Sequence, residues 1–159
     1  MTLLELGTNS LTGSIPPQLG NLTNLVHFYL NNNSLTGFIP GELGNLTNLL
    51  NLNVSSNSLS GTIPSELGNL GQNLSSLSLN NNELCGAIPP TLINLVNLTD
   101  GGGLNLSNNY LITAVEQSLD DFILLKSSND WKTTQGILPH CPYPFYWPMF
   151  MPSIIGAVR

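Results

Sequence analysis

The side chains that most often carry catalysis are few and widely separated in this chain of 159 residues. The two histidines are His27 and His140, and the two cysteines are Cys85 and Cys141. His27 is far from both cysteines in the sequence, and the pair His140-Cys141 lies in a Pro-rich segment with no third group to orient the imidazole. Two cysteines this far apart also supply neither a four-thiolate metal site nor a disulfide framework. We therefore predict no catalytic residues, no metal ligands and no cofactor, and the cysteines leave the redox compartment open.

Charged residues are also scarce, which excludes several classes of partner. The chain has nine acidic and three basic residues, and no Lys or Arg precedes Lys126. Binding to nucleic acid or to an anionic membrane surface needs clustered cations, so neither partner is expected. No basic stretch leads into an apolar run at the amino terminus, so no signal peptide is predicted. The apolar stretch 141–158 contains several prolines, which argues against a membrane span.

Leucine and asparagine dominate the composition, with 31 and 22 copies, and this points to a repeated unit. Shifting the sequence by 24 residues aligns it with itself, and a fourth copy follows after a spacing of 25. The aligned columns are Asn9, Asn33, Asn57 and Asn82; Gly13, Gly37, Gly61 and Gly86; and the Ile-Pro pairs that begin at Ile15, Ile39, Ile63 and Ile88. Agreement at this many positions indicates true repetition.

Each copy predicts a short strand, a turn and a 3₁₀-like return. Apolar residues alternate toward the end of 25–30, as in a strand, and recur every three residues in 43–49, as in a tight helical turn. A single copy of 24 residues buries too little apolar surface to offset its backbone entropy, so the copies must stack. The repeated Asn is predicted to be a buried amide that satisfies backbone groups of its own and neighbouring coils.

A degenerate fifth copy and a different tail complete the chain. The segment Thr113-Ala114-Val115-Glu116 has the pattern of a capping box, and a helix ending near Lys126 is expected to follow. Its inner face is predicted to carry Val115, Leu119, Phe122 and Leu125. We thus divide the chain into a repeat domain of about five copies, residues 1–126, and an irregular tail rich in Pro and aromatic residues, 127–159.

The segment Asn33 to Leu49 resembles the plant-type leucine-rich repeat of receptor-like kinases, receptor-like proteins and polygalacturonase-inhibiting proteins. The resemblance extends from residue 1 to about residue 124. It implies an α/β repeat fold, a right-handed solenoid with a concave parallel β-sheet, a second short sheet and a convex side of 3₁₀ turns and loops. Proteins of this family are usually extracellular or at the cell surface, but without a signal peptide the localisation of this chain stays open.

The first repeat departs from the family pattern. Met1 occupies its first apolar position, so the Cys-bearing amino-terminal cap of the family is missing. Leu4, Leu6, Leu11 and Ile15 are then expected to present an open core edge, through which the chain can self-associate. The sequence is interpreted as a fragment of a receptor-like protein or as a truncated product with no independent role.

Function in such a solenoid is expected at the strand positions between the inward leucines, whose side chains point outward. His27 and Tyr29, with Glu5 alongside, are the anchors predicted for a partner, since the other positions are small amides and hydroxyls. The predicted partner-binding residues are Glu5, His27, Tyr29, Asn51, Asn53, Ser76 and Ser78. A solvated face without a partner is the alternative, and glycans on the sequons at Asn53 and Asn105 would weaken the assignment.

The functional prediction is a non-catalytic module that binds a protein or peptide on its concave face. The resemblance also leaves open an inhibitor of a secreted carbohydrate-degrading enzyme, like the polygalacturonase inhibitors.

Overall fold

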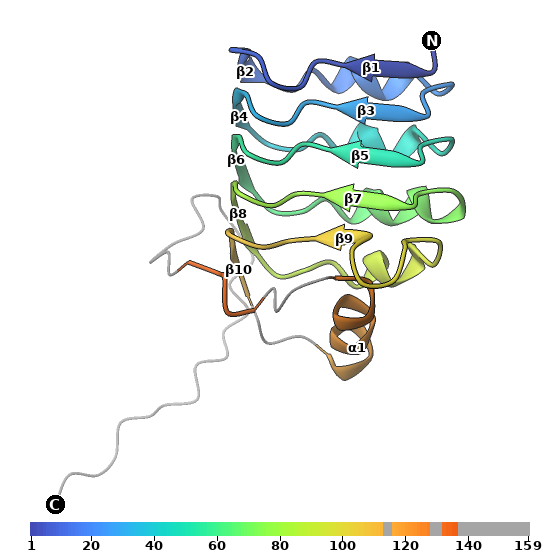
Figure 1. Ribbon diagram of the computed structural model, residues 1–159, viewed down its shortest axis with the longest axis vertical. Helices are drawn as coiled ribbons and strands as arrows, with labels where there is room; N and C mark the ends of the chain where they lie inside the picture. The colour runs from blue at the N-terminus through green and yellow to red at the C-terminus, as the bar shows by residue number, and fades with distance from the viewer. Residues whose placement is uncertain (113–115, 128–131, 137–159) are drawn as a thin grey trace, which may run out of the picture.

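The computed structural model describes residues 1–112, 116–127 and 132–136, which form a stack of coils closed by a helix (Figure 1). Each coil contributes one strand to each of two parallel sheets. The first sheet, the β1–β9 sheet, has the order β1 (Leu3–Glu5), β3 (His27–Tyr29), β5 (Asn51–Asn53), β7 (Ser76–Ser78) and β9 (Leu104–Asn105). The second has the order β10 (Tyr110–Leu111), β8 (Glu83–Gly86), β6 (Ser58–Gly61), β4 (Ser34–Gly37) and β2 (Thr12–Ser14).

Short 3₁₀ helices return the chain from the second sheet to the first. They are η1 (Pro17–Asn21), η2 (Gly41–Asn45), η3 (Ser65–Gln72) and η4 (Pro90–Asn94). The Pro of each Ile-Pro pair precedes the first helical residue in extended conformation, as at Pro40 (φ −65°, ψ 133°). The predicted repeat solenoid, with parallel strands on one side and 3₁₀ turns on the other, is confirmed.

Register between strands follows the repeat, so that like residues lie side by side. Leu4 pairs with Phe28, Phe28 with Leu52, and Leu52 with Leu77. Phe28, Leu52 and Leu77 are almost fully buried and belong to one continuous core that reaches Ile123. The two residues that flank each of these in its strand point to the opposite face.

A ladder of asparagine amides, which are buried at Asn82 and Asn109 and half-buried at Asn33 and Asn57, joins the coils at the end of the first strand. The Nδ2 of Asn82 donates to Val54 O and Leu79 O, both at 3.1 Å, and its Oδ1 accepts from the Leu59 amide at 3.0 Å. The same pattern recurs at Asn33, Asn57 and Asn109. The scaffold role predicted for this asparagine column is confirmed.

The first coil is only partly open, which corrects the expectation for its apolar residues. Ile15 is 2% exposed and belongs to the core, because the second coil covers it. Leu4 and Leu6 are half-buried against the core, and Leu11 is exposed. The open edge is therefore narrower than the sequence suggested.

Helix α1 (Gln117–Lys126) covers the other end of the core, below β9 in Figure 1. Leu119 and Ile123 are its buried residues, whereas Leu125 is 56% exposed. The predicted inner face was wrong at Leu125. Leu125 follows Leu119 by six residues, which is about 600° of rotation, so its side chain lies about 240° around the helix from that of Leu119 and does not share its face. The N-cap residue is Glu116, which makes no side-chain cap hydrogen bond; Thr113 to Val115 lie outside the described residues.

Coil-like hydrogen bonding continues beyond Lys126. Ser127 is buried and forms a parallel β-bridge with Leu104. Gln135 takes the position of a ladder asparagine: its Oε1 accepts from the Leu111 amide and its Nε2 donates to Leu106 O. The described residues of the expected tail thus continue the pattern of the coils; the others lie outside the described residues.

Candidate functional site

The outward positions of the β1–β9 sheet form columns that run across the coils. One column places Leu3, His27, Asn51 and Ser76 in register, and the next places Glu5, Tyr29, Asn53, Ser78 and Asn105 in register. All seven predicted partner-binding residues lie in these two columns. We call this surface the strand face.

Three of the predicted residues form a connected cluster. The rings of His27 and Tyr29 are stacked, with centroids 6.1 Å apart and an interplanar angle of 16°. His27 Nδ1 lies 2.7 Å from Asn51 Oδ1 in the next strand, a hydrogen bond that fixes the imidazole when Nδ1 carries the proton. His27 Nε2 is then left as an acceptor. Both rings are half-buried, so they present one surface and keep an open edge.

Glu5 extends this cluster toward the first coil. It pairs in register with Tyr29 and is exposed. Glu5 therefore supplies a carboxylate next to the aromatic pair.

The side chain of Asn53 is fixed by hydrogen bonds to Ser55, just beyond the end of its strand. Its Oδ1 accepts hydrogen bonds from the Ser55 amide at 3.0 Å and from Ser55 Oγ at 2.7 Å. Asn105 makes the same two bonds with Ser107, at 3.2 and 2.7 Å. In both residues the amide oxygen is engaged locally, which leaves Nδ2 to meet a partner. Both are also sequon asparagines.

The β7 part of the strand face carries only small side chains. Ser76 and Ser78 are half-buried, and the Leu77 between them points into the core. These small hydroxyls lie two strands from the His27 and Tyr29 rings, beyond Asn51 and Asn53, and leave room for a side chain of a partner.

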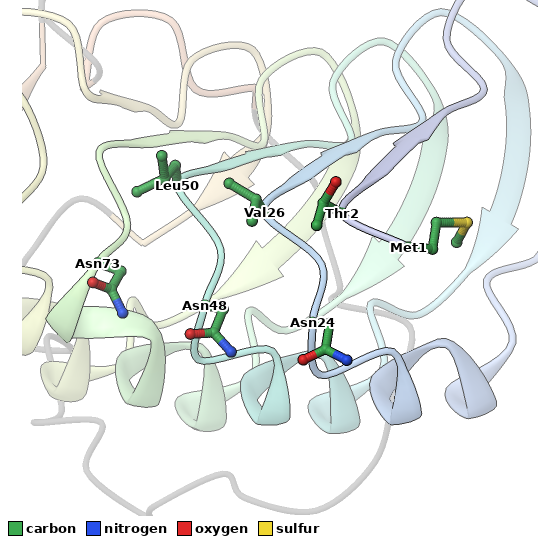
Figure 2. A pocket seen from close by; sticks show the side chains of 7 residues that line it. All are labelled: Met1, Thr2, Asn24, Val26, Asn48, Leu50 and Asn73. Atoms are coloured by element: carbon green, nitrogen blue, oxygen red, sulfur yellow. The ribbon is translucent and has the colours of Figure 1, made fainter.

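Sequence reasoning missed a groove at the edge of the strand face. It has a volume of about 600 Å³ and is lined by Met1, Thr2, Asn24, Val26, Asn48, Leu50 and Asn73 (Figure 2). The 24-residue recurrence of Asn24 and Asn48 was the signal available in the sequence. We call this feature the edge groove.

Cys85 takes part in a disulfide, which the spacing of the cysteines did not predict. It is 1% exposed on β8 and is disulfide-bonded. The other cysteine of the chain, Cys141, lies outside the described residues.

Two other kinds of feature are absent from the part of the chain that the structure describes. It has no cluster of three or more His, Cys, Asp or Glu side chains suited to a metal ion. Within the same ranges, no helix has the length and apolar character needed to cross a membrane.

One family model matches the chain over more than half of its length. The family model described as Leucine Rich Repeat matches residues 1–22, 24–46, 48–70 and 73–95. A search of curated proteins gave no significant match.

Solved structures resemble the chain over most of its length. A TDR receptor is 44% identical with a TM-score of 0.64, and the match covers 68% of this chain and 18% of the receptor. The plant peptide hormone receptor RGFR1, in complex with RGF2, is 38% identical with a TM-score of 0.70, covering 78% of this chain and 19% of that one. A plant ice-binding protein is 36% identical with a TM-score of 0.64, covering 70% and 35%. The chain spans less than a fifth of either receptor.

Proposed function

Because the chain belongs to the leucine-rich-repeat family and is of the plant type, we propose that it is a non-catalytic module that binds a peptide or protein segment on its strand face. The single observation that carries this proposal is the stacked pair of His27 and Tyr29, held in place by Asn51. The RGFR1 structure, which contains a peptide hormone receptor with RGF2, supports a ligand of this class.

The chemistry of the face favours a partner that supplies an aromatic or apolar side chain and hydrogen-bonding groups. Aromatic residues are common binding hot spots because they bury a large area at low entropic cost. Glu5 is the only charged residue among the seven predicted contacts. Binding is therefore expected to depend weakly on ionic strength.

The proposal is tested with peptides selected from a phage-displayed library of random linear sequences. The affinity of the best peptide is measured by calorimetry for the wild-type chain and for the His27→Ala and Tyr29→Ala variants. Each variant is expected to weaken binding at least tenfold, or by about 1.4 kcal/mol. Glu42→Ala, an exposed change on η2, is the matched control and is expected to leave the affinity unchanged. Unchanged affinity in both ring variants would overturn the site.

Ice binding is a second candidate function, favoured by the likeness to the plant ice-binding protein and by a row of exposed asparagines on the 3₁₀ side. An exposed, uncharged amide recurs on the 3₁₀ side once per coil, at Asn21, Asn45, Asn69 and Asn94. Measurable thermal hysteresis in a solution of the chain, abolished by Asn45→Lys with Asn69→Lys, is the expected result. Its absence would remove this candidate.

Two predictions from the resemblance stand beside these. Inhibition of a secreted carbohydrate-degrading enzyme is tested by adding the chain to a polygalacturonase and measuring reducing-sugar release.

Self-association through the first coil rests on the exposed Met1, Leu3 and Leu11, which are 64%, 50% and 37% accessible. Sedimentation velocity over a range of concentrations is expected to show a larger species that Leu3→Asp removes.

A further inference from the structure

The edge groove arises where two successive backbone amides, just before and at the start of a strand of the strand face, donate to the same carbonyl. We call this arrangement the pivot. The amides of Leu50 and Asn51 both donate to Val26 O, at 2.8 and 3.2 Å. The amides of Ser75 and Ser76 both donate to Leu50 O, at 2.8 and 3.0 Å. Where successive amides share one carbonyl, the regular alternation of side chains between the two faces of the sheet is interrupted. The side chain of Leu50 therefore faces the sheet edge, where it is 39% exposed.

Two rows of side chains line the groove and run from coil to coil (Figure 2). One row is Thr2, Val26 and Leu50, which is mainly apolar. The other row consists of the asparagines in the loops that precede the strands: Asn24, Asn48 and Asn73. A ligand that occupies the groove thus meets an apolar surface on one side and amides on the other.

Hydrogen bonds to the backbone set the direction of the amides. Asn48 Nδ2 donates to Thr23 O, and Asn73 Nδ2 donates to Thr47 O, both at 2.9 Å. Within the described residues, the Oδ1 atoms of Asn48 and Asn73 accept no hydrogen bond, and Figure 2 shows them turned away from the Nδ2 side. In two successive coils the groove therefore offers a fixed amide oxygen, that of Asn48 and that of Asn73, at the ~4.8 Å spacing of neighbouring strands.

This spacing discriminates between classes of ligand. An extended peptide advances ~3.3 Å per residue, so its donors fall out of step with the acceptors. A sugar ring in an extended β-linked glycan advances by nearly one strand spacing, has apolar C–H faces and carries hydroxyl donors on its rim. None of the seven lining side chains is charged, and the amino group of Met1 adds a positive charge at the first coil; the part of the groove at Val26, Leu50, Asn48 and Asn73 therefore matches a neutral ligand better than an acidic one.

We propose that the edge groove binds a neutral, extended β-linked glycan. The sugar rings pack on Val26 and Leu50, and their hydroxyls donate to the Oδ1 atoms of Asn48 and Asn73. This site is separate from the His27 and Tyr29 pair and goes beyond the peptide-binding function proposed above. Asn73 also begins the sequon Asn73-Leu74-Ser75, so an N-linked glycan there would occupy the same groove.

The probe is cellohexaose, titrated by calorimetry into the full chain produced in a bacterial periplasm, where cysteines oxidise and Asn73 carries no glycan. Leu50→Asp is expected to lower the affinity at least tenfold, because it places a charge under the sugar rings. The control is Val96→Asp, since Val96 is 61% exposed and does not line the groove. Asn48→Ala combined with Asn73→Ala is also expected to lower the affinity at least tenfold. Circular dichroism melting curves establish that each variant is folded.

Three results would overturn the proposal. They are a wild-type chain that does not bind cellohexaose, a loss of affinity in Val96→Asp equal to that in Leu50→Asp, and equal affinity for an acidic oligogalacturonide of the same length. His27→Ala separates this proposal from the previous one. It is expected to retain cellohexaose binding while it loses the selected peptide, and loss of cellohexaose binding in this folded variant would also overturn the groove assignment.

Discussion

Gln135 Oε1 lies 3.0 Å from the backbone nitrogen of Leu111 and accepts its hydrogen bond. One coil earlier, Asn109 Oδ1 accepts the amide of Leu84 at 3.1 Å. Gln135 Nε2 also donates to Leu106 O, the carbonyl that Asn109 Nδ2 reaches. A glutamine from outside the repeats thus completes the asparagine ladder at its last coil, where Leu111 is buried and cannot be hydrated.

Replacing Gln135 by Ala is expected to destabilise the last coil by about 1–3 kcal/mol, because the Leu111 amide loses its acceptor. Hydrogen exchange at the Leu111 amide should accelerate, while exchange at Leu59 in the middle of the stack should not. Gln135→Glu keeps the acceptor but loses the donor to Leu106 O, so its effect should also be destabilising. Gln18→Ala, an exposed change on η1, is the control. Exchange at Leu111 that Gln135→Ala leaves unaltered would contradict the capping role.

Replacing an asparagine inside the ladder is expected to lower the free energy of unfolding more than replacing Gln135 at its end. Asn82 is 6% exposed and joins carbonyls of two coils to the amide of Leu59. Asn82→Ala should lower the free energy of unfolding by roughly 2–4 kcal/mol, because several buried backbone groups lose their partner. Urea denaturation followed by circular dichroism measures the change. Asn69→Ala, at an exposed position on η3, is expected to stay within about 0.5 kcal/mol of wild type.

Glycine on the 3₁₀ side sets how closely the coils approach. A Cβ atom on Gly44 would lie only 2.3 Å from Glu66 O in the next coil, so Gly44→Ala must push the backbones apart. We expect a loss of roughly 1–3 kcal/mol, as for overpacked cores. A Cβ atom on Gly102 would have no neighbour within 4 Å, so Gly102→Ala serves as the matched control. Equal melting temperatures for Gly44→Ala and Gly102→Ala would contradict this account.

Much of the fold could be predicted because the determinants repeat. Each coil independently places leucines inside and an asparagine at the corner, so errors at one position are corrected by the others. The end of the stack lacks this redundancy. The inner face of α1 depends on the helix rotation that buries Ile123 rather than Leu125, and Gln135 joins the ladder without belonging to any repeat.

The two candidate sites also differ in how far the sequence could predict them. Strand alternation predicted that His27 and Tyr29 point outward in neighbouring columns, and the structure stacks their rings. The edge groove could not be predicted in this way, because it depends on a local pivot where two amides share one carbonyl at Val26 and Leu50. Such a pivot changes the direction of a side chain without changing the residue pattern.

The disulfide of Cys85 leads to a prediction about the carboxy-terminal segment. Cys85 is buried on β8, and the sequence contains one other cysteine, Cys141. After blocking of free thiols, a peptide map made without reductant should contain Cys85 and Cys141 in one linked species. Reduction, or Cys85→Ala with Cys141→Ala, is expected to cost about 2–4 kcal/mol of stability, because the closed loop restricts the unfolded chain. The recovery of both cysteines as separately blocked peptides from oxidised protein would contradict this linkage. Its presence would indicate that the chain folds in an oxidising compartment.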